Sequence, residues 1–314
     1  MRHLISLAQV GPDNLAELVQ TSLDFASRRN GNGKPLSGKI VGLYFRGTST
    51  RTRTAFTAGA IRLGAEVVTY GPMDLQIATG ETVRDTGRVL SSFLDALVVR
   101  TNGSAGEMAD LAAQDRMAVI NAMSEDEHPT QAVADLVTIS EALGGLQGTH
   151  VLYVGEGNNS AAALALAVAM TPGMRLTVIT PEGYGLPHAT LAEADKFAQL
   201  TGAVVEQHHD IAHAPEGVDA VYATRWQTMG VPKADPDWKE KFKPFSITES
   251  LMARVSKPSG TIFLHDLPAV RGDDVMDEVL DGPQSLAFRQ AEHKMTSAMA
   301  VLSWCIGNGN GAAH

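Results

Sequence analysis

Short apolar runs that alternate with longer amphipathic segments are the feature that most constrains the fold of this chain. In the first half the runs lie at 40–45, 66–70, 96–99 and 118–121. Each is rich in aliphatic residues and is followed by a stretch of helical or loop character. Strands that alternate with helices indicate βαβ units, and such units form a parallel sheet. The first half therefore predicts an α/β domain.

The alternation restarts after Gly145, with strand-like runs at 150–154, 176–180, 203–205, 220–222 and 261–264. A helical pattern from Pro129 to Leu143 separates the two sets, and it has the proline start and glycine end that are typical of helices. A last helix is expected over 285–306. We predict two doubly wound parallel-sheet domains joined by helices. Their expected bounds are 1–135 and 146–284, with a C-terminal helix and tail at 285–314 that packs back on the first domain.

Charge and cysteine content exclude several classes of protein. The chain has 25 Lys and Arg against 35 Asp and Glu, and the resulting charge of −10 repels nucleic acid and anionic lipid. The longest apolar stretch, 161–170, is far shorter than the ~18 residues of a membrane span. Polar residues interrupt the N-terminal apolar run too early for a signal peptide. The single cysteine, Cys305, cannot form an intrachain disulfide. We expect a cytoplasmic protein without nucleic-acid or membrane partners.

A segment rich in hydroxyl and guanidinium groups, Phe45 to Arg53, lies where the first strand passes into a helix. It carries four hydroxyls and three arginines. A helix N-terminus offers N–H groups, Ser and Thr cap it, and Arg supplies a fork that matches phosphate. The pattern predicts a phosphate site, although it lacks the spacing of a nucleotide P-loop. The alternative is an ordinary N-cap followed by a solvated basic helix face.

A second polar cluster, His128-Pro129-Thr130-Gln131, begins the long helix. Residues three apart share a helix face, so His128 and Gln131 can point into one crevice. An imidazole or amide there can donate a hydrogen bond to a developing oxyanion. The alternative is that His128 only caps the helix and Gln131 lies on the surface.

Three further segments follow strands of the second half: 155–159, 224–230 and 265–268. They occupy predicted carboxyl ends of strands, where open α/β sheets bind ligands. The Gly-x-Gly of the first segment lacks the third glycine of a dinucleotide fingerprint, so a tight turn is favoured over NAD binding. We interpret His208-His209-Asp210 and His213 as solvated residues of a polar connector, and we expect no metal.

Together these segments resemble the aspartate/ornithine carbamoyltransferase family, most closely its ornithine branch. Segment 49–53 matches the family's S-T-R-T-R motif, and segment 128–131 matches H-P-T-Q. Segment 155–159 is similar to G-D-G-N-N, and segment 265–275 is similar to H-C-L-P-x-x-R-G-x-E-V. The matches run in the same order over nearly the whole chain.

The resemblance implies an enzyme, a carbamoyltransferase without metal or organic cofactor. It implies a homotrimer whose active sites lie between subunits. The substrates are carbamoyl phosphate and a small amino-acid acceptor. A neutral amine attacks the carbamoyl carbon, a tetrahedral oxyanion forms, and phosphate leaves without a covalent enzyme intermediate, so catalysis depends on positioning and electrostatics.

The resemblance also implies roles for residues that match the motifs. The phosphate is held by Ser49, Thr50, Arg51 and Thr52. The carbamoyl oxygen is polarised by Thr50, Arg100 and His128, and the carbamoyl amino group is oriented by Gln131 and the backbone of Leu267. Gln76, from the neighbouring subunit, and Lys294, which stands in place of the arginine in the family's closing A-E-N-R, are also expected to bind carbamoyl phosphate.

The acceptor pocket departs from the family pattern. The ornithine branch has D-x-W-x-S-M-G, whereas this chain has Arg225-Trp226-Gln227-Thr228-Met229-Gly230, which we interpret as a cation in place of a carboxylate. The cysteine of H-C-L-P is Asp266. The expected acceptor-binding residues are Asn159, Arg225, Gln227, Thr228, Met229 and Asp266. Arg225 is expected to meet the acceptor's carboxylate and Asp266 its amine, unless these two side chains form a salt bridge with each other.

These departures leave the acceptor open among three candidates. We favour altered specificity, with a shorter diamino acid such as 2,3-diaminopropionate, over ornithine itself and over aspartate or a relative. A hypothesis from another class is a family member without catalysis that serves as a binding or regulatory subunit. The complete set of residues predicted to bind carbamoyl phosphate argues against that hypothesis.

Overall fold

The computed structural model describes residues 2–27, 33–227 and 232–307. The chain divides into two units. Unit 1 comprises residues 1–134 and 293–314, and unit 2 comprises residues 135–292. The divisions fall inside two helices, α6 (Pro129–Leu143) and α12 (Ala287–Ile306).

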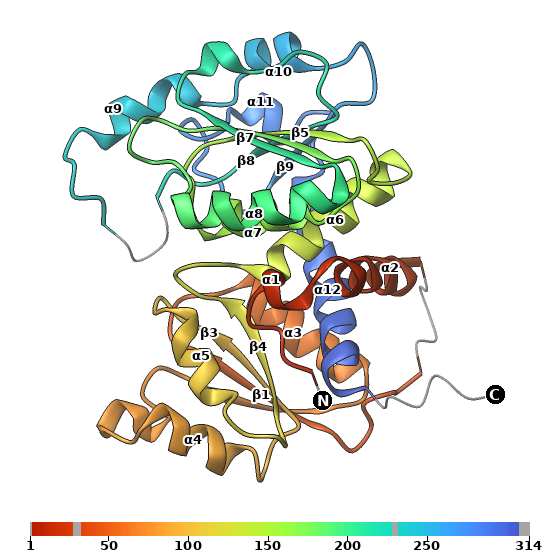
Figure 1. Ribbon diagram of the computed structural model, residues 1–314, viewed down its shortest axis with the longest axis vertical. Coiled ribbons are helices and arrows are strands. Elements are labelled where there is room, and N and C mark those ends of the chain that lie inside the picture. Colours follow the sequence, from red (N-terminus) through yellow and green to blue (C-terminus); the bar gives the residue numbers. More distant parts are fainter. Residues whose placement is uncertain (1, 28–32, 228–231, 308–314) are drawn as a thin grey trace. The chain divides into compact units, whose positions relative to one another are not determined.

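Unit 1 is built on a four-stranded parallel sheet in the order β2-β1-β3-β4. Its strands are β1 (Ile40–Phe45), β2 (Glu66–Tyr70), β3 (Ala96–Arg100) and β4 (Ala118–Met123). Helices α4 (Val83–Leu90) and α5 (Ala105–Leu111) cover one face, and α3 (Arg51–Arg62) and α12 lie on the other (Figure 1). The remaining elements of this unit are α1 (Leu7–Val10), α2 (Pro12–Ser27) and the short helix η1 (Gln76–Thr79).

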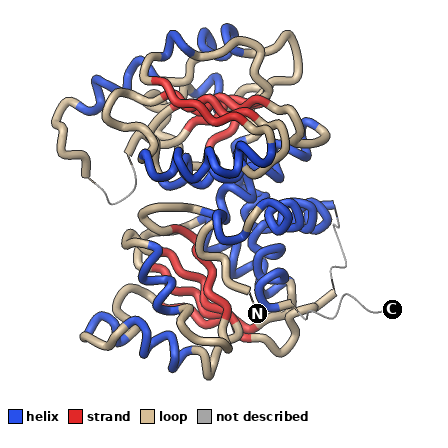
Figure 2. Tube along the Cα trace, in the orientation of Figure 1, coloured by secondary structure: helices blue, strands red, loops and turns tan. Residues whose placement is uncertain are grey.

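Unit 2 is built on a five-stranded parallel sheet in the order β7-β6-β5-β8-β9. Its strands are β5 (His150–Val154), β6 (Arg175–Ile179), β7 (Val204–His208), β8 (Ala220–Ala223) and β9 (Ile262–His265). Figure 2 shows this sheet with helices on both sides. Helices α7 (Asn159–Ala169) and α8 (His188–Thr201) cover one face, and α10 (Glu249–Val255) and α11 (Asp277–Leu280) cover the other. Between β7 and α10 lie η2 (Ile211–His213), α9 (Trp238–Phe242) and η3 (Lys243–Phe245).

The structure confirms the predicted α/β class with two doubly wound parallel sheets. All nine predicted strands are present, and the helix predicted from Pro129 to Leu143 has those ends. The interpretation of His208 was wrong, because this residue ends β7 and does not lie in a connector. Strand β7 is at the edge of its sheet and is only partly buried, so it tolerates the polar residues that made it resemble a loop.

The order of the strands reverses once in each sheet, between β1 and β3 in unit 1 and between β5 and β8 in unit 2. At such a switch point the connections leave in opposite directions, and the crevice outside the carboxyl ends is the usual ligand site of an open α/β sheet. In unit 1 the switch point adjoins the start of α3 and Arg100. In unit 2 it adjoins the turn 155–158 and the segment that follows Ala223.

None of the helices in the part of the chain that the structure describes has the length and hydropathy of a membrane-spanning segment.

Candidate functional site

The start of α3 presents hydroxyl and N–H groups at the switch point of unit 1. Thr50 is the N-cap residue, and its hydroxyl makes no capping hydrogen bond to the helix. The Oγ of Ser49 accepts from the backbone N–H of Arg53 at 3.3 Å, and Thr52 is buried in the first turn. This helix end therefore combines an exposed cap hydroxyl with the positive end of a helix dipole, as an anion site requires.

The three arginines of this segment have different surroundings. Arg46 binds Glu107 through both terminal nitrogens, at 2.8 and 2.6 Å, and donates to Tyr44 Oη at 2.9 Å. The guanidinium of Arg53 lies 5.1 Å from the ring centroid of Phe45. Arg51 is the first residue of α3, so among the three it is the one at the helix N-terminus.

Arg100, His128, Gln131 and Lys294 form a polar cluster in unit 1. Arg100 is buried at the end of β3, and its carbonyl accepts from the N–H of Arg46 at 3.0 Å. His128 and Gln131 are buried at the start of α6, and Lys294 on α12 donates to Oε1 of Gln131. The structure thus brings together four of the residues assigned to carbamoyl phosphate.

His128 is held neutral by its surroundings. Burial, and then the positive charges of Lys294 and Arg100, keep the pKa of His128 well below its ordinary value of 6.5. The Oγ1 of Thr130 lies 3.4 Å from Nδ1. A neutral imidazole keeps one N–H group, which can be donated to a substrate oxygen.

Gln76 lies apart from this cluster. It begins η1, is exposed, and its Oε1 accepts from Oγ1 of Thr79 at 2.6 Å. No hydrogen bond between described residues joins it to the start of α3 or to His128.

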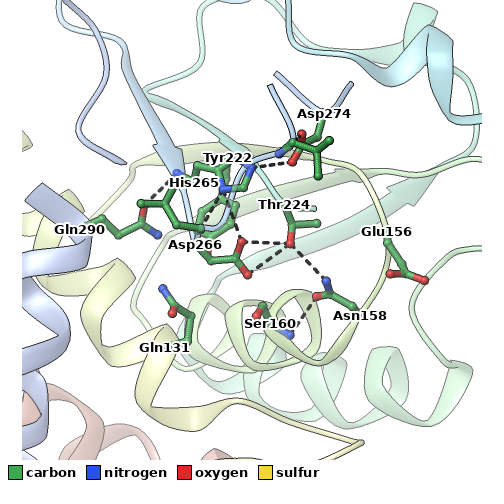
Figure 3. A network of polar contacts seen from close by, with 12 residues as sticks. Gln131, Glu156, Asn158, Ser160, Tyr222, Thr224, His265, Asp266, Asp274 and Gln290 are labelled. Carbon is green, nitrogen blue, oxygen red and sulfur yellow. Dashed lines mark hydrogen bonds and ion pairs between the residues drawn. The ribbon is translucent and has the colours of Figure 1, made fainter. Parts of the chain in front are cut away.

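A carboxylate lies beside the switch point of unit 2. Thr224 follows β8 and Asp266 follows β9, and the Oγ1 of Thr224 donates to both oxygens of Asp266 at 3.1 and 3.2 Å. The same Oγ1 accepts from Nδ2 of Asn158 at 3.2 Å, and Oδ1 of Asn158 caps α7 by accepting from Ser160 N at 3.0 Å (Figure 3). The next residue, Asn159, is buried. This network fixes the Asp266 side chain, which is only 14% exposed.

Arg225 does not occupy the position of the aspartate in the ornithine pattern. Counted back from Trp226, the aspartate of the D-x-W pattern corresponds to Thr224 and not to Arg225. Thr224 is also the residue that contacts Asp266, and no salt bridge between described residues joins Arg225 to Asp266. In this chain a carboxylate, Asp266, thus lies at the end of β9, beside the position at the end of β8 where the ornithine pattern has its aspartate. The assignment of Arg225 was an error of one residue in aligning the motif. The contact between Thr224 and Asp266 could not be predicted from the sequence, because only the pairing of Ala223 with His265 places the two positions side by side.

Asp266 has no cationic partner among the described residues. The Nδ1 of His265 lies 3.6 Å from its Oδ1, but this nitrogen accepts from Leu267 N at 2.9 Å. The Nε2 of His265 carries the proton and donates to Asp274 at 2.9 Å. Burial and the negative charge of Asp266 raise the pKa of Tyr153 well above 10, so that phenol stays neutral. The carboxylate is thus nearly enclosed, and among the described residues its side-chain donor is the hydroxyl of Thr224.

The backbone of Leu267 is held in an unusual conformation by the same histidine. Its φ of 52° lies in the left-handed region, which costs an L-residue with a side chain about 1–2 kcal/mol. Asp274 orients His265, and His265 accepts from the Leu267 N–H, so the two side chains stabilise this backbone. Arg225 and Gln227 are half-buried on the segment after β8. Thr228 and Met229 lie outside the described residues.

Comparisons with known proteins agree with this arrangement. Residues 2–141 match the family model described as aspartate/ornithine carbamoyltransferase, carbamoyl-P binding domain, and residues 147–305 match its Asp/Orn binding domain. The chain is 37% identical to an ornithine carbamoyltransferase of Halalkalibacterium halodurans over 96% of this chain and 94% of that protein. It is also 37% identical to one of Methanothermobacter thermautotrophicus, over 98% of this chain and all of that protein.

A solved structure gives the same result. The ornithine carbamoyltransferase of Pyrococcus furiosus superposes with a TM-score of 0.91 at 33% identity, covering 98% of this chain and 97% of that chain. Fold and site together define an α/β transferase of carbamoyl groups. The chain belongs to the aspartate/ornithine carbamoyltransferase family, and it is a carbamoyltransferase of the ornithine/aspartate type.

Glu127, which sequence reasoning did not single out, precedes His128 and makes the free energy of unfolding depend on pH. It is buried, and its Oε1 accepts from Leu7 N at 2.8 Å. Burial raises its pKa from 4.5 to about 7. Between pH 4.5 and about pH 7, Glu127 has lost its proton in the unfolded chain and keeps it in the folded chain. The free energy of unfolding therefore falls as pH rises through this range, by up to about 3 kcal/mol.

We predict that Glu127→Gln removes this pH dependence, because the amide still accepts from Leu7 but carries no charge. Urea unfolding between pH 5 and pH 8 measures the slope. The control is Glu125→Gln, an exposed residue two positions away. Parallel stability profiles for the wild type and Glu127→Gln would contradict the assignment.

Proposed function

We propose that unit 1 binds carbamoyl phosphate, that unit 2 binds the amine acceptor, and that the acceptor is a small amino acid with a carboxylate. The observation that carries the first part is the cluster of Arg100, His128, Gln131 and Lys294, in which cations surround a neutral imidazole. The corresponding domains are 1–135 and 146–284, and the part of the last helix from His293 onward belongs with the first domain. Turnover of carbamoyl phosphate against a panel of amino acids tests this function directly.

In this proposal each group of unit 1 has a chemical task. Ser49, Thr50, Arg51 and Thr52 hold the phosphate at the start of α3. Thr50, Arg100 and the neutral His128 donate to the carbamoyl oxygen, on which negative charge grows as the amine attacks. Gln131, held by Lys294, orients the carbamoyl amino group.

We predict that Arg51→Ala weakens carbamoyl-phosphate binding about 10- to 100-fold, because it removes a charge-assisted pair worth about 1.5–3 kcal/mol. Calorimetry measures the affinity. The matched control is Arg62→Ala, which removes an exposed arginine from the other end of the same helix and leaves the affinity unchanged. Near-normal affinity in Arg51→Ala would refute the role of this helix N-terminus.

We propose further that the enzyme is a homotrimer in which Gln76 serves the site of the neighbouring subunit. Unit 1 exposes an apolar set close to Gln76 in sequence, consisting of Val68, Met73, Val89 and Phe93, with 39%, 76%, 52% and 66% exposure. Exposed apolar side chains of this size favour contact with another chain. Strand β2, which carries Val68, is an exposed edge strand.

A mixing experiment tests the shared site. We predict that Gln76→Ala and Arg51→Ala are each severely impaired, and that reassembled mixtures regain activity because some sites receive both intact residues. Native mass spectrometry verifies that mixed trimers have formed. If mixed trimers show no recovery, each site is built from one chain.

For the acceptor, we propose that Asp266 binds an ammonium and that Arg225 and Gln227 donate to the acceptor's carboxylate. The support is a nearly enclosed carboxylate without a cationic partner among the described residues. The names of the relatives favour ornithine as the acceptor. The ornithine pattern has its aspartate at position 224, whereas this chain has Asp266 on the neighbouring strand end. This difference favours a diamino acid of another length, of which 2,3-diaminopropionate is the example to test.

We predict that Asp266→Asn raises the acceptor's Michaelis constant about 10- to 100-fold with carbamoyl-phosphate affinity unchanged, since only a charge-assisted hydrogen bond is lost. A second variant, Thr224→Asp with Asp266→Cys, rebuilds the ornithine pattern and should improve ornithine relative to 2,3-diaminopropionate. Steady-state kinetics with ornithine, aspartate and 2,3-diaminopropionate give both results. Ornithine as the best substrate of the wild type, with unaltered kinetics in Asp266→Asn, would return the protein to ordinary ornithine specificity.

A further inference from the structure

The ammonium of Lys233 is enclosed by a carboxylate and three aromatic rings. The side chain is 7% exposed and pairs with Glu156, which is 18% exposed. The Nζ lies 4.6 Å from the ring centroid of Tyr184, 5.0 Å from that of Phe242 and 5.5 Å from that of Trp238. Cation–π contacts of this kind are strongest where water is excluded. We call these three rings and Glu156 the Lys233 cage.

The rings of the Lys233 cage also pack on one another and on Trp226, which lies in the segment after β8. Phe242 lies 4.9 Å from Tyr184 and 5.9 Å from Trp238, measured between ring centroids. It lies 5.6 Å from Trp226, which is buried between Arg225 and Gln227 in the sequence. Phe242 therefore contacts both Trp226 and Lys233.

Glu156, at the other end of the ion pair, belongs to a turn whose backbone packs closely against a neighbouring segment. A Cβ on Gly157 would lie 2.4 Å from the carbonyl carbon of Gly185, so the two backbones touch. The hydroxyl of Tyr153 donates to the carbonyl of Glu156 at 2.7 Å. The turn leads into Asn158, which donates to Thr224 in the Asp266 network. The carboxylate of Glu156, on this closely packed turn, thus holds Lys233, and through Phe242 the Lys233 cage also contacts Trp226.

The ion pair also sets the charge near Asp266. Negative charges on Asp266 and Glu156 both raise the pKa of Tyr153, so both carboxylates act on the same region of unit 2. Lys233 neutralises Glu156, whereas Asp266 has no cationic partner among the described residues. Of these two carboxylates, only Asp266 therefore lacks a cationic partner among the described residues.

We propose that Lys233 is a positioning residue for the acceptor: it neutralises Glu156 and fixes the segment around Trp226 against the turn 155–158. This inference rests on the proposed binding of the acceptor by unit 2. Loss of the ammonium leaves Glu156 buried without a counter-ion, which favours displacement of the turn and repels the acceptor's carboxylate.

The test compares variants of Lys233 in the full-length enzyme by steady-state kinetics and thermal unfolding. Lys233→Met raises the acceptor's Michaelis constant at least about tenfold, the cost of leaving a charge unpaired, while carbamoyl-phosphate affinity stays within about twofold. Lys233→Arg keeps the charge and restores most of the acceptor affinity. Lys233→Met combined with Glu156→Gln, which removes both charges, also recovers most of it.

The matched control is Lys239→Met. Lys239 also lies over Trp238, at 5.7 Å, but it is 59% exposed and pairs with Asp273. Its loss leaves the Michaelis constant within about twofold, as expected for an exposed ion pair.

Three outcomes overturn the inference in distinguishable ways. If the wild type carbamoylates no amino acid, the proposed function fails and the role of Lys233 falls with it. If the wild type is active and Lys233→Met changes only the melting temperature, the function stands and Lys233 is purely structural. If the double variant stays as impaired as Lys233→Met, neutralisation of Glu156 is not the role of Lys233.

Discussion

The parallel pairing of β8 with β5 on one side and with β9 on the other is the constraint on which the chemistry of unit 2 depends. Because the carboxyl ends of parallel strands meet at one edge, the residues that follow Val154, Ala223 and His265 are brought together although more than a hundred positions separate the first from the last. The Asn158, Thr224 and Asp266 network is the direct result. Unit 1 uses the same rule at β1 and β3, where Arg46 hydrogen-bonds to Arg100.

The two units create opposite electrostatic surroundings for their histidines. His128 lies among cations that lower its pKa, so it is neutral, and the proposed function uses it as a donor. The Nε2 of His265 donates to Asp274, and its Nδ1 accepts from the backbone N–H of Leu267. In unit 1 positive charge is available for a phosphate and an oxyanion, whereas in unit 2 a carboxylate is available for an ammonium. Unit 1 is thus suited to an anionic group, and unit 2 is suited to a cationic one.

The fold and the motifs of unit 1 could be predicted from the sequence because each depends on residues that are close together in the chain. The runs at 40–45 and 96–99 have the composition of buried strands, and Ser49 to Arg53 carries its chemistry within five residues. The relation of Thr224 to Asp266 could not be predicted, because it depends on strand register. The Lys233 cage was missed for a similar reason, since its rings come from positions 184, 238 and 242. His208 was misread because an edge strand carries the polarity of a loop.

The contact between Thr224 and Asp266 also limits how the ornithine pattern and the present one can be interconverted by substitution. The carboxylate and its hydroxyl donor occupy adjacent strand ends, so converting the ornithine pattern into the present one requires two substitutions. With position 266 changed first, two carboxylates stand at hydrogen-bonding distance and must share a proton. With position 224 changed first, the pocket has no carboxylate for an amine. The order therefore decides whether the intermediate variant is electrostatically strained or lacks its counter-ion, and no order of single substitutions at these two positions avoids both states.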